Sequence, residues 1–179
     1  DWSDARKESV RYTADLTNIL SAYAFKQDGR FIYLSSEAVY GRSYSSDIHE
    51  TEPASAKSFQ AMALLQGENI CRSYRDTRGM DTRILRFDHM YGIPRKGKTD
   101  RNPCFWMTLE MLKTNQIAAN SRTVFSMIYQ DDAVAFAYRA MMEESPKYPL
   151  YHITSGEAIT QMDLAELIRQ NADGVEIRD

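Results

Sequence analysis

The chain has 179 residues, of which 43% are apolar and 26% charged, so its size and composition fit a single globular domain with a real core. Its formal net charge of −3 gives no reason to propose nucleic acid or an anionic membrane as a partner. Two cysteines, Cys71 and Cys104, are too few for a disulfide framework and favour a reducing compartment. No apolar run approaches the roughly 20 residues that cross a bilayer, so we expect a cytoplasmic protein.

The first half of the chain predicts a helix, a strand, a second helix and a second strand. Apolar residues recur at helical spacing over 4–26 and again over 57–78, a segment expected to stop at Gly79. Between them, the apolar run 31–34 is typical of a strand that is buried on both faces, as in a parallel sheet. The segment 81–87 alternates in the manner of a strand.

The second half continues this alternation. A helix is expected over 103–113, because Pro is favoured in a first turn, and a strand is expected over 124–129. A helix that ends at Glu144, a short strand over 151–154 and a final helix that opens at Thr160 follow. Strands that alternate with helices indicate an α/β architecture with a parallel sheet.

Two of the expected helices carry a stripe of side chains on one face. In the segment 57–78 this stripe consists of Gln60, Leu64, Gly67, Cys71 and Tyr74. In the helix that ends at Glu144 the apolar side consists of Val134, Phe136, Ala137, Ala140 and Met141. We expect the first stripe to pack on a sheet, with the glycine allowing a close approach.

The run 31–41 reads Phe-Ile-Tyr-Leu-Ser-Ser-Glu-Ala-Val-Tyr-Gly and places two hydroxyls at the carboxyl end of a buried strand. Open α/β sheets bind their ligands at such strand ends. The run resembles the strand and active-site loop of the extended short-chain dehydrogenase/reductases, the NAD-dependent sugar-nucleotide epimerase/dehydratase family. Five further segments resemble that family in the same order and spacing: 18–22, 67–68, 85–94, 128–134 and 151–157.

The resemblance implies a partial Rossmann-like parallel sheet flanked by helices, with elements of a small C-terminal substrate-binding subdomain. Residues 1–179 would form a single α/β unit, the C-terminal portion of an extended short-chain dehydrogenase/reductase. Within it, 1–88 and 124–154 would be mostly Rossmann-type sheet and helices. Residues 89–123 and 155–179 would be mostly the substrate-side subdomain.

The glycine-rich turn of the family does not occur in this sequence. Family members receive the dinucleotide pyrophosphate at such a turn, on a helix N-terminus. The eight glycines lie at positions 29, 41, 67, 79, 92, 97, 156 and 174, and no G-x-G-x-x-G spacing results. The resemblance therefore starts in the middle of the family's fold, and we expect the chain to be part of a longer protein.

The catalytic pattern of the family is only partly matched. Family members move a hydroxyl proton with a Tyr, whose pKa is lowered by a Lys one helical turn later, while hydride passes to NAD. Counted back from Gly67-Glu68, these positions fall at Gln60 and Leu64, which supply neither a general base nor a charge. Ser36 matches the family's catalytic Ser or Thr. A serine at a strand end is also a common capping or turn residue, so both roles stay open.

The resemblance also implies roles for neighbouring residues. Ser35, with the residues at the Tyr and Lys positions, would line the cofactor pocket. Glu37 lies where dehydratase-type members often carry an acid, and His89 takes the place of an Asn, so both are expected on the substrate side. In the family an Arg commonly binds the nucleotide diphosphate, and its position falls near Phe125 of this chain. The helix Asn that often supports the family's site falls near Tyr12.

The resemblance implies relation to NAD(P)-dependent nucleotide-sugar epimerases and dehydratases, whose cofactor is NAD or NADP and whose substrate is a nucleotide-sugar. Because the Tyr/Lys pair and the dinucleotide turn are missing, we expect this chain to bind no cofactor and to catalyse nothing on its own. The alternative is a non-catalytic oligomerising or ligand-binding module. A homodimer would form through helices 4–26 and 57–78, which often make a four-helix bundle in the family, or through the edge of strand 31–34.

A second alternative is a protein that binds nucleoside triphosphate. Residues 92–99, Gly-Ile-Pro-Arg-Lys-Gly-Lys-Thr, match the phosphate-binding pattern G-x-x-x-x-G-K-[ST]. A true loop of this kind leads directly into a helix at Gly-Lys-Thr, whereas residues 100–103 intervene here and Pro94 lacks a backbone donor. A basic surface loop is the competing interpretation. The three histidines show no metal-ligand spacing, so we expect no metal.

Overall fold

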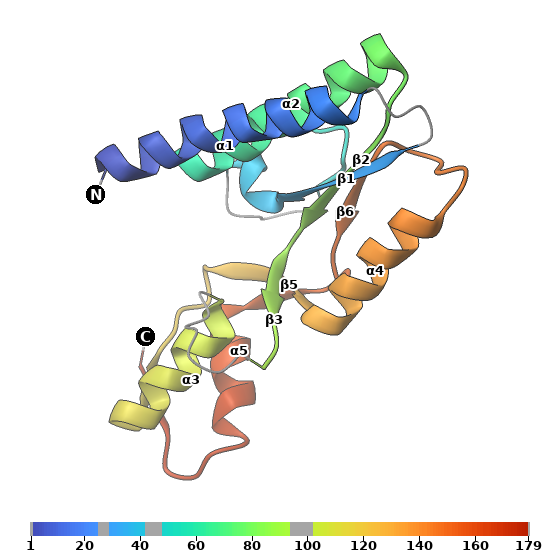
Figure 1. Cartoon of the computed structure of the whole chain (residues 1–179). Coiled ribbons are helices and arrows are strands. Elements are labelled where there is room, and N and C mark those ends of the chain that lie inside the picture. Colours follow the sequence, from blue (N-terminus) through green and yellow to red (C-terminus); the bar gives the residue numbers. More distant parts are fainter. Residues whose placement is uncertain (1, 25–28, 42–47, 94–101, 179) are drawn as a thin grey trace. The chain divides into compact units, whose positions relative to one another are not determined.

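The computed structural model describes residues 2–24, 29–41, 48–93 and 102–178. They form an α/β protein with two compact units, each assembled from separate segments of the chain (Figure 1). Unit 1 comprises residues 1–42, 48–87 and 134–153, and unit 2 comprises residues 43–47, 88–133 and 154–179. The predicted fold class, a parallel sheet flanked by helices, is confirmed. The predicted assignment of substrate-side segments remains a prediction.

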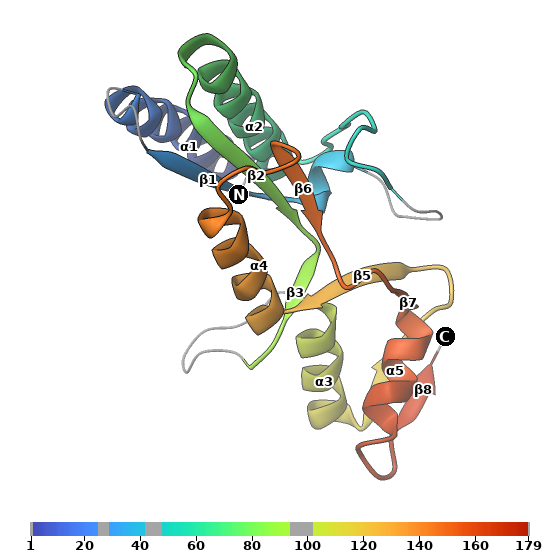
Figure 2. The ribbon, with the colours of Figure 1, turned by 90° about the vertical axis from the view of Figure 1, so that its right-hand side faces the viewer.

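Unit 1 is built on a parallel sheet in the order β1-β2-β6. Its strands are β1 (Arg30–Ser36), β2 (Asp81–Phe87) and β6 (Leu150–Ile153). Helices α1 (Trp2–Tyr23) and α2 (Phe59–Arg78) cover one face of the sheet. Helix α4 (Gln130–Met142), which belongs to this unit from Val134 onward, covers the other face (Figure 2). Among the described strands, only β2 pairs with β1, so β1 is an edge strand.

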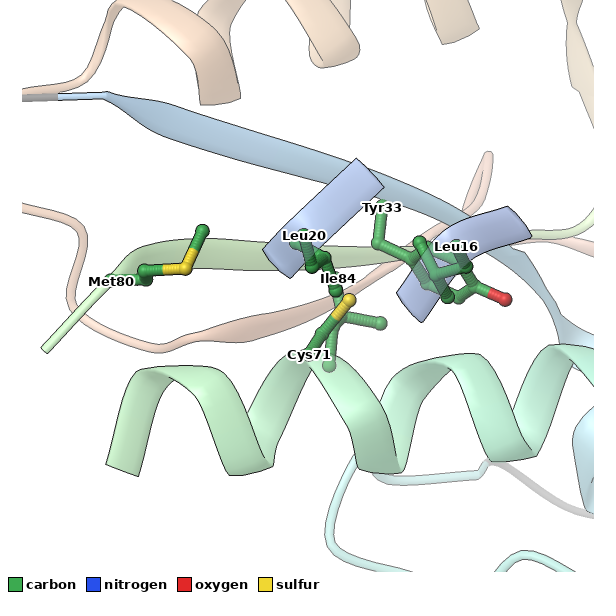
Figure 3. Packing of buried hydrophobic residues seen from close by; sticks show 6 residues of the cluster. All are labelled: Leu16, Leu20, Tyr33, Cys71, Met80 and Ile84. Atoms are coloured by element: carbon green, nitrogen blue, oxygen red, sulfur yellow. The ribbon is translucent and has the colours of Figure 1, made fainter. Parts of the chain in front are cut away.

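The core of unit 1 lies between the sheet and the two long helices. It consists of six buried side chains: Leu16, Leu20, Tyr33, Cys71, Met80 and Ile84 (Figure 3). Burying one Leu or Ile side chain stabilises a fold by about 1.5–3 kcal/mol. Burial also raises the pKa of the Cys71 thiol to about 12, so this cysteine stays protonated and packs as a small apolar group.

Helix α2 begins and ends at clear caps. The Ala61 N–H donates to the Ser58 side chain at 3.1 Å, and Gly79 ends the helix with a left-handed φ of 67°. The predicted end of this helix is confirmed. Most of the predicted stripe is buried or half-buried, but Gln60 is exposed in the first turn, where its amide group keeps its contact with water.

Two arginines of the sheet hold the C-terminal end of α4. Arg30 and Arg83 donate to the main-chain carbonyls of Met141 and Ala140, which belong to the carbonyls that a helix end leaves unpaired. Asp81 binds both arginines, with N···O distances of 2.7 Å to Arg30 and 2.8 Å to Arg83. Arg83 is only 1% exposed, so its buried charge depends on this carboxylate.

The apolar stripe predicted for this helix does not mark its buried face. Val134, Phe136 and Met141 are 67%, 44% and 47% exposed, whereas Ala137 and Ala140 are half-buried. The prediction was wrong for the three large side chains. Small alanines let the helix backbone come close to the sheet arginines. Val134 and Met141 stay largely exposed, and Phe136 lines a cavity together with Leu85 and Ile153 of the sheet.

Unit 2 combines short strands with two helices. β3 (His89–Tyr91) runs parallel to β5 (Val124–Tyr129), which pairs antiparallel with β7 (Ala158–Thr160). β4 (Gln116–Ala118) pairs with β8 (Glu176–Arg178). Helices α3 (Pro103–Thr114) and α5 (Gln161–Arg169) enclose a second core. This core consists of Met107, Met111, Ile117, Ala119, Leu164 and Ala165.

Side-chain caps set the starts of both helices in unit 2. The Phe105 N–H donates to Asn102 Oδ1 at 2.7 Å, and Pro103 occupies the first turn of α3 as predicted. Thr160 and Asp163 form a full capping box at the start of α5, which confirms the predicted opening of that helix.

The stabilising effect of Asp81 should depend on pH. Burial favours a higher pKa for this carboxyl, but hydrogen bonds from Arg83 and Arg30 outweigh burial and hold its pKa below the usual value. The stabilisation is therefore present above the unfolded-state pKa, about 3.9, and is lost as pH falls toward the folded-state value. We expect the melting temperature of Asp81→Asn to lie below that of the wild type at neutral pH, with the difference shrinking below about pH 4.

Asp15→Asn is the matched control for this measurement. Asp15 pairs with Arg11 on the exposed surface of α1, where both side chains are largely in water, so its loss should hardly change the melting temperature. An equal melting temperature for Asp81→Asn and the wild type at neutral pH would contradict the role assigned to this carboxylate.

Candidate functional site

The candidate site lies at the carboxyl end of β1. Ser36 is the N-cap of the 3₁₀ helix η1 (Glu37–Tyr40), and its oxygen accepts a hydrogen bond from the Ala38 N–H at 3.2 Å. The same hydroxyl donates to Glu37 Oε2 at 2.5 Å, and Glu37 is only 7% exposed. Ser36 is therefore a capping residue in the structure, and its proton is directed at a carboxylate. Its catalytic role remains a prediction.

A left-handed glycine closes the turn that follows. Gly41 has a φ of 70°, and its N–H donates to the Ala38 carbonyl at 3.1 Å. A Cβ at this position would overlap the main-chain oxygen of Ser55. Glycine is therefore required both for the backbone conformation and for the available space. The turn holds the serine and the glutamate in place by backbone contacts.

The preceding serine faces the opposite side of the sheet. Successive side chains of a strand alternate between its faces, so Ser35 and Ser36 point in opposite directions. Ser35 is buried, and its hydroxyl donates to Glu68 Oε1 at 2.7 Å. This hydroxyl proton is thus held by α2, and the expected role of Ser35 in lining a cofactor pocket remains a prediction.

Glu68 is the centre of a buried charged cluster. Its carboxylate is fully buried, and Arg86 binds both oxygens, at 2.8 and 2.7 Å. Arg72, one helical turn further along α2, adds a hydrogen bond at 3.1 Å. Burial by itself would lower the pKa of Arg86, but the hydrogen bonds and charge of Glu68 raise it. Arg86 therefore keeps its positive charge in the interior, where it binds the carboxylate through two hydrogen bonds.

The charged cluster reaches the turn of the candidate site through Tyr40. The guanidinium carbon of Arg86 lies 4.6 Å from the centre of the Tyr40 ring, a cation–π distance. The Tyr40 hydroxyl donates to the main-chain oxygen of His49 at 3.4 Å. Burial raises the pKa of Tyr40, so this phenol remains protonated near neutral pH. One network thus connects α2, β2 and the turn after Ser36.

The packing of α2 on β1 fixes the places of Gln60 and Leu64. The Tyr33 hydroxyl donates to the Leu64 carbonyl at 3.1 Å, and a Cβ at Gly67 would overlap the Tyr33 phenol. Leu64 packs against the core of unit 1, and Gln60 lies in water. Neither side chain ionises, so these two positions provide no group that transfers a proton.

His89 and Phe125 are in contact within unit 2. Their ring centres are 5.8 Å apart and the rings meet edge to face, at an angle of 63°. The resemblance places the family's Asn at position 89 and its diphosphate-binding Arg near position 125. An aromatic pair therefore stands where an amide and a cation are expected. His89 belongs to unit 2, whereas the other candidate site residues belong to unit 1.

Most of the phosphate-loop pattern at 92–99 lies outside the described residues. The helix that follows starts at Pro103, with Asn102 as its N-cap, so its N-terminal end is not at Thr99. In the described ranges, no three metal-ligating side chains gather to hold an ion. No helix in those same ranges has the length and apolarity that a membrane span needs.

Comparison with known proteins identifies the family. A model of the NAD dependent epimerase/dehydratase family matches residues 2–153. The chain belongs to this family. Its fold is similar to that of UDP-N-acetylglucosamine 4-epimerase from Methanobrevibacter ruminantium M1, with a TM-score of 0.82 and 18% identity over 100% of this chain and 60% of that one. UDP-glucuronic acid 4-epimerase from Bacillus cereus gives a TM-score of 0.78 and 18% identity over 92% of this chain and 53% of that one.

Two curated relatives are considerably longer than this chain. Low-salt glycan biosynthesis protein Agl12 of Haloferax volcanii is 25% identical over 147 residues, which is 82% of this chain and 47% of that protein. Protein y4nG of Sinorhizobium fredii is 25% identical over 145 residues, which is 80% of this chain and 35% of that protein. The chain thus spans less than half the length of both relatives.

The buried ion pair between Glu68 and Arg86 was not predicted in the sequence analysis. Strand β2 is buried along nearly all of its length, yet it contains Arg83 and Arg86. A buried cation needs an opposite charge, and the acidic residue at position 68 of the neighbouring helix supplies it. The two arginines in this otherwise apolar strand could therefore have indicated a buried ion pair with a neighbouring helix.

Removing the Glu68 charge should destabilise unit 1 strongly. Glu68→Gln leaves the buried Arg86 without a counter-charge, and breaking a buried pair in this way costs about 3–5 kcal/mol. Amide hydrogen exchange of β2 gives the free energy of opening for this unit by itself. Arg72→Ala should cost about 1 kcal/mol or less, because Arg72 is partly in water.

Glu110→Gln is the control for that comparison, since Glu110 is exposed on α3 of the other unit. The protection of β2 in this variant should equal that of the wild type. A Glu68→Gln protein whose β2 amides exchange as slowly as those of the control would show that the ion pair contributes little.

Proposed function

We propose that residues 1–179 keep the fold of the NAD-dependent epimerases and dehydratases but do not, by themselves, oxidise a nucleotide-sugar with NAD or NADP. The observation that carries this proposal is the side chains at the two proton-transfer positions. Gln60 is exposed and carries a neutral amide, and Leu64 packs into the core of unit 1. Neither side chain can therefore take the hydroxyl proton that must leave while hydride passes to the dinucleotide.

The assignment of these two positions is counted from Gly67 and Glu68 on α2. The family position of an acidic residue on this helix is occupied by Glu68, which is tied to Arg86 and Ser35. Its neighbour Gly67 is pressed against Tyr33. These contacts fix the position of α2 on the sheet, and they support counting the proton-transfer positions back from Glu68 to Leu64 and Gln60.

The substrate side supports the same proposal. The family's diphosphate-binding Arg falls near Phe125, and Phe125 contacts the ring of His89 and carries no positive charge. A nucleotide diphosphate binds through cations and N–H donors, and an aromatic pair replaces two of these donors here. Ser36 keeps its hydroxyl, but this group alone neither accepts a hydride nor forms the carbonyl of an oxidised sugar.

A direct assay tests the proposal. The chain is incubated with NAD or NADP and with UDP-glucuronic acid or UDP-N-acetylglucosamine, the nucleotide-sugars of the structurally similar enzymes. Absorbance at the reduced-nicotinamide band and proton NMR of the sugar are expected to show no reduction and no isomerisation. The Bacillus cereus enzyme in the same buffer serves as the positive control.

Reduction of NAD or inversion of a sugar carbon by this chain would overturn the proposal. In that event Ser36→Ala separates a reaction at this site from a contaminating enzyme, because only the former should be lost.

Gln60→Tyr combined with Leu64→Lys is expected to remain inactive, since the dinucleotide turn is missing from residues 1–179.

A non-catalytic module that associates with itself is the second candidate function, and an unpaired strand favours it. In the described part of the chain β1 pairs with β2 alone, and Leu34 on this strand is 55% exposed. An edge strand with few charges invites pairing with another chain. Apolar side chains on the helix pair are exposed as well: Val10, Tyr12 and Ile19 on α1 and Met62 on α2.

We expect light scattering to give the mass of a dimer as the concentration rises. Leu34→Lys should restore the monomer if the strand edge carries the contact, whereas Val10→Lys should do so if the helices carry it. A constant monomer mass at the highest soluble concentration would refute self-association by either surface.

A further inference from the structure

Helix α4 lies against strands β2 and β6 in unit 1 (Figure 2), and a cavity remains between the helix and these strands. Its volume is about 250 Å³, and the described residues that line it all belong to this unit. The stretches of chain that form it, 83–85 and 136–153, are described without a gap. Most of the wall is apolar and consists of Leu85, Phe136, Ala140, Pro146, Tyr151 and Ile153.

The buried cation in this lining already has all of its partners within unit 1. Arg83 is only 1% exposed, and its Nε and Nη2 donate to the two oxygens of Asp81 at 2.9 and 2.8 Å. Its third nitrogen, Nη1, donates to the Ala140 carbonyl. Every nitrogen of the guanidinium is therefore hydrogen-bonded, and an incoming anion would have to displace the Asp81 carboxylate.

The other polar groups of the lining leave nothing in the interior for a polar ligand. The Tyr148 N–H donates to the Tyr151 hydroxyl at 3.0 Å. Arg139 and Glu143 carry opposite charges and are exposed, so water solvates both and they attract a ligand only weakly. No buried side-chain nitrogen or oxygen of the described lining lacks a hydrogen-bond partner, so these side chains offer a ligand apolar surface.

Volume and lining together indicate the class of ligand. An apolar cavity of about 150 Å³ can hold benzene, so this larger one has room for one or two aromatic rings. Phe136 on the helix and Tyr151 on the sheet supply rings on two sides, against which a ligand ring can pack edge to face. Phe136 is 44% exposed, and a ligand would remove part of this apolar surface from water. We propose that the cavity binds small uncharged aromatic compounds.

This inference goes beyond the proposed function and does not depend on it. Ser35, Gln60 and Leu64, the residues expected in a cofactor pocket, face or belong to α2, on the other side of the sheet from α4. Ser36 shares the sheet face of the cavity, but it lies at the end of the edge strand β1 and is not among the residues that line the cavity. The cavity can therefore be occupied whether or not the chain is catalytic.

Methyl NMR of the 179-residue chain, labelled in the δ1-methyl groups of isoleucine, tests the proposal. The probes are toluene, benzoate and benzylamine, which share one ring and differ in charge. Toluene should shift the resonance of Ile153, identified through Ile153→Val, and leave that of Ile84 unchanged, because Ile84 lies in the core on the other face of the same sheet. Benzoate and benzylamine should bind about tenfold more weakly or worse, since the interior supplies no partner for either charge.

Two pairs of variants complete the test. Ala140→Leu should place extra carbon in the cavity and weaken toluene binding about tenfold. Ala135→Leu, at an exposed position on the same helix, is its matched control and should change binding by about twofold or less. Arg139→Gln and Glu143→Gln should each leave toluene binding within about twofold of the wild type, because both charges are solvated.

Four results would each overturn the proposal. The first is no shift of Ile153 with toluene up to its solubility limit, and the second is a set of shifts confined to unit 2. The third is equal or tighter binding of benzoate or benzylamine, which would mean recognition by Arg139 or Glu143. The fourth is a folded Ala140→Leu chain that binds toluene as the wild type does. The wild-type titrations decide the matter even where that variant fails to fold.

Discussion

The carboxylate of Glu68 is the constraint on which unit 1 depends. It is fully buried, and a charge in that position survives only when its hydrogen-bonding capacity is filled. Arg86 from β2, Ser35 from β1 and Arg72 from α2 itself fill it. These partners come from three elements, so the helix and both strands have one relative position that satisfies the charge. Arg86 also lies over Tyr40, and the same network therefore extends to the turn that holds Ser36.

This network shows which residues of α2 fix the helix on the sheet. The contacts that fix α2 on the sheet involve Glu68, Gly67 and Tyr33, and none of them requires a tyrosine at position 60 or a lysine at position 64. The packing of this helix is therefore independent of the side chains at positions 60 and 64. Family membership alone does not establish an activity, because one fold hosts many functions.

The two faces of the unit 1 sheet are held by different means. On one face the helix pair buries an apolar core, and a buried ion pair adds a fixed geometry. On the other face α4 is held through its C-terminal carbonyls, to which two arginines donate while Asp81 keeps those arginines in place. Because this attachment acts on the helix backbone, large side chains such as Val134 and Phe136 remain exposed. The helix is thus placed by polar contacts at its end more than by its apolar stripe.

The sequence by itself determined the order of the long helices and buried strands, the caps at Gly79 and Thr160, and the absence of ionisable groups at positions 60 and 64. Each of these follows from neighbouring residues, because helical spacing, capping and turn formation act over a few positions of the chain. Tertiary structure decided which charges meet, which face of α4 is covered, and that His89 contacts Phe125. Four short strands, β3, β4, β7 and β8, also depend on it, since three residues carry too little pattern and form a strand only when a distant segment pairs with them. Contacts between residues far apart in the chain depend on the packed arrangement of whole elements, which no local spacing encodes.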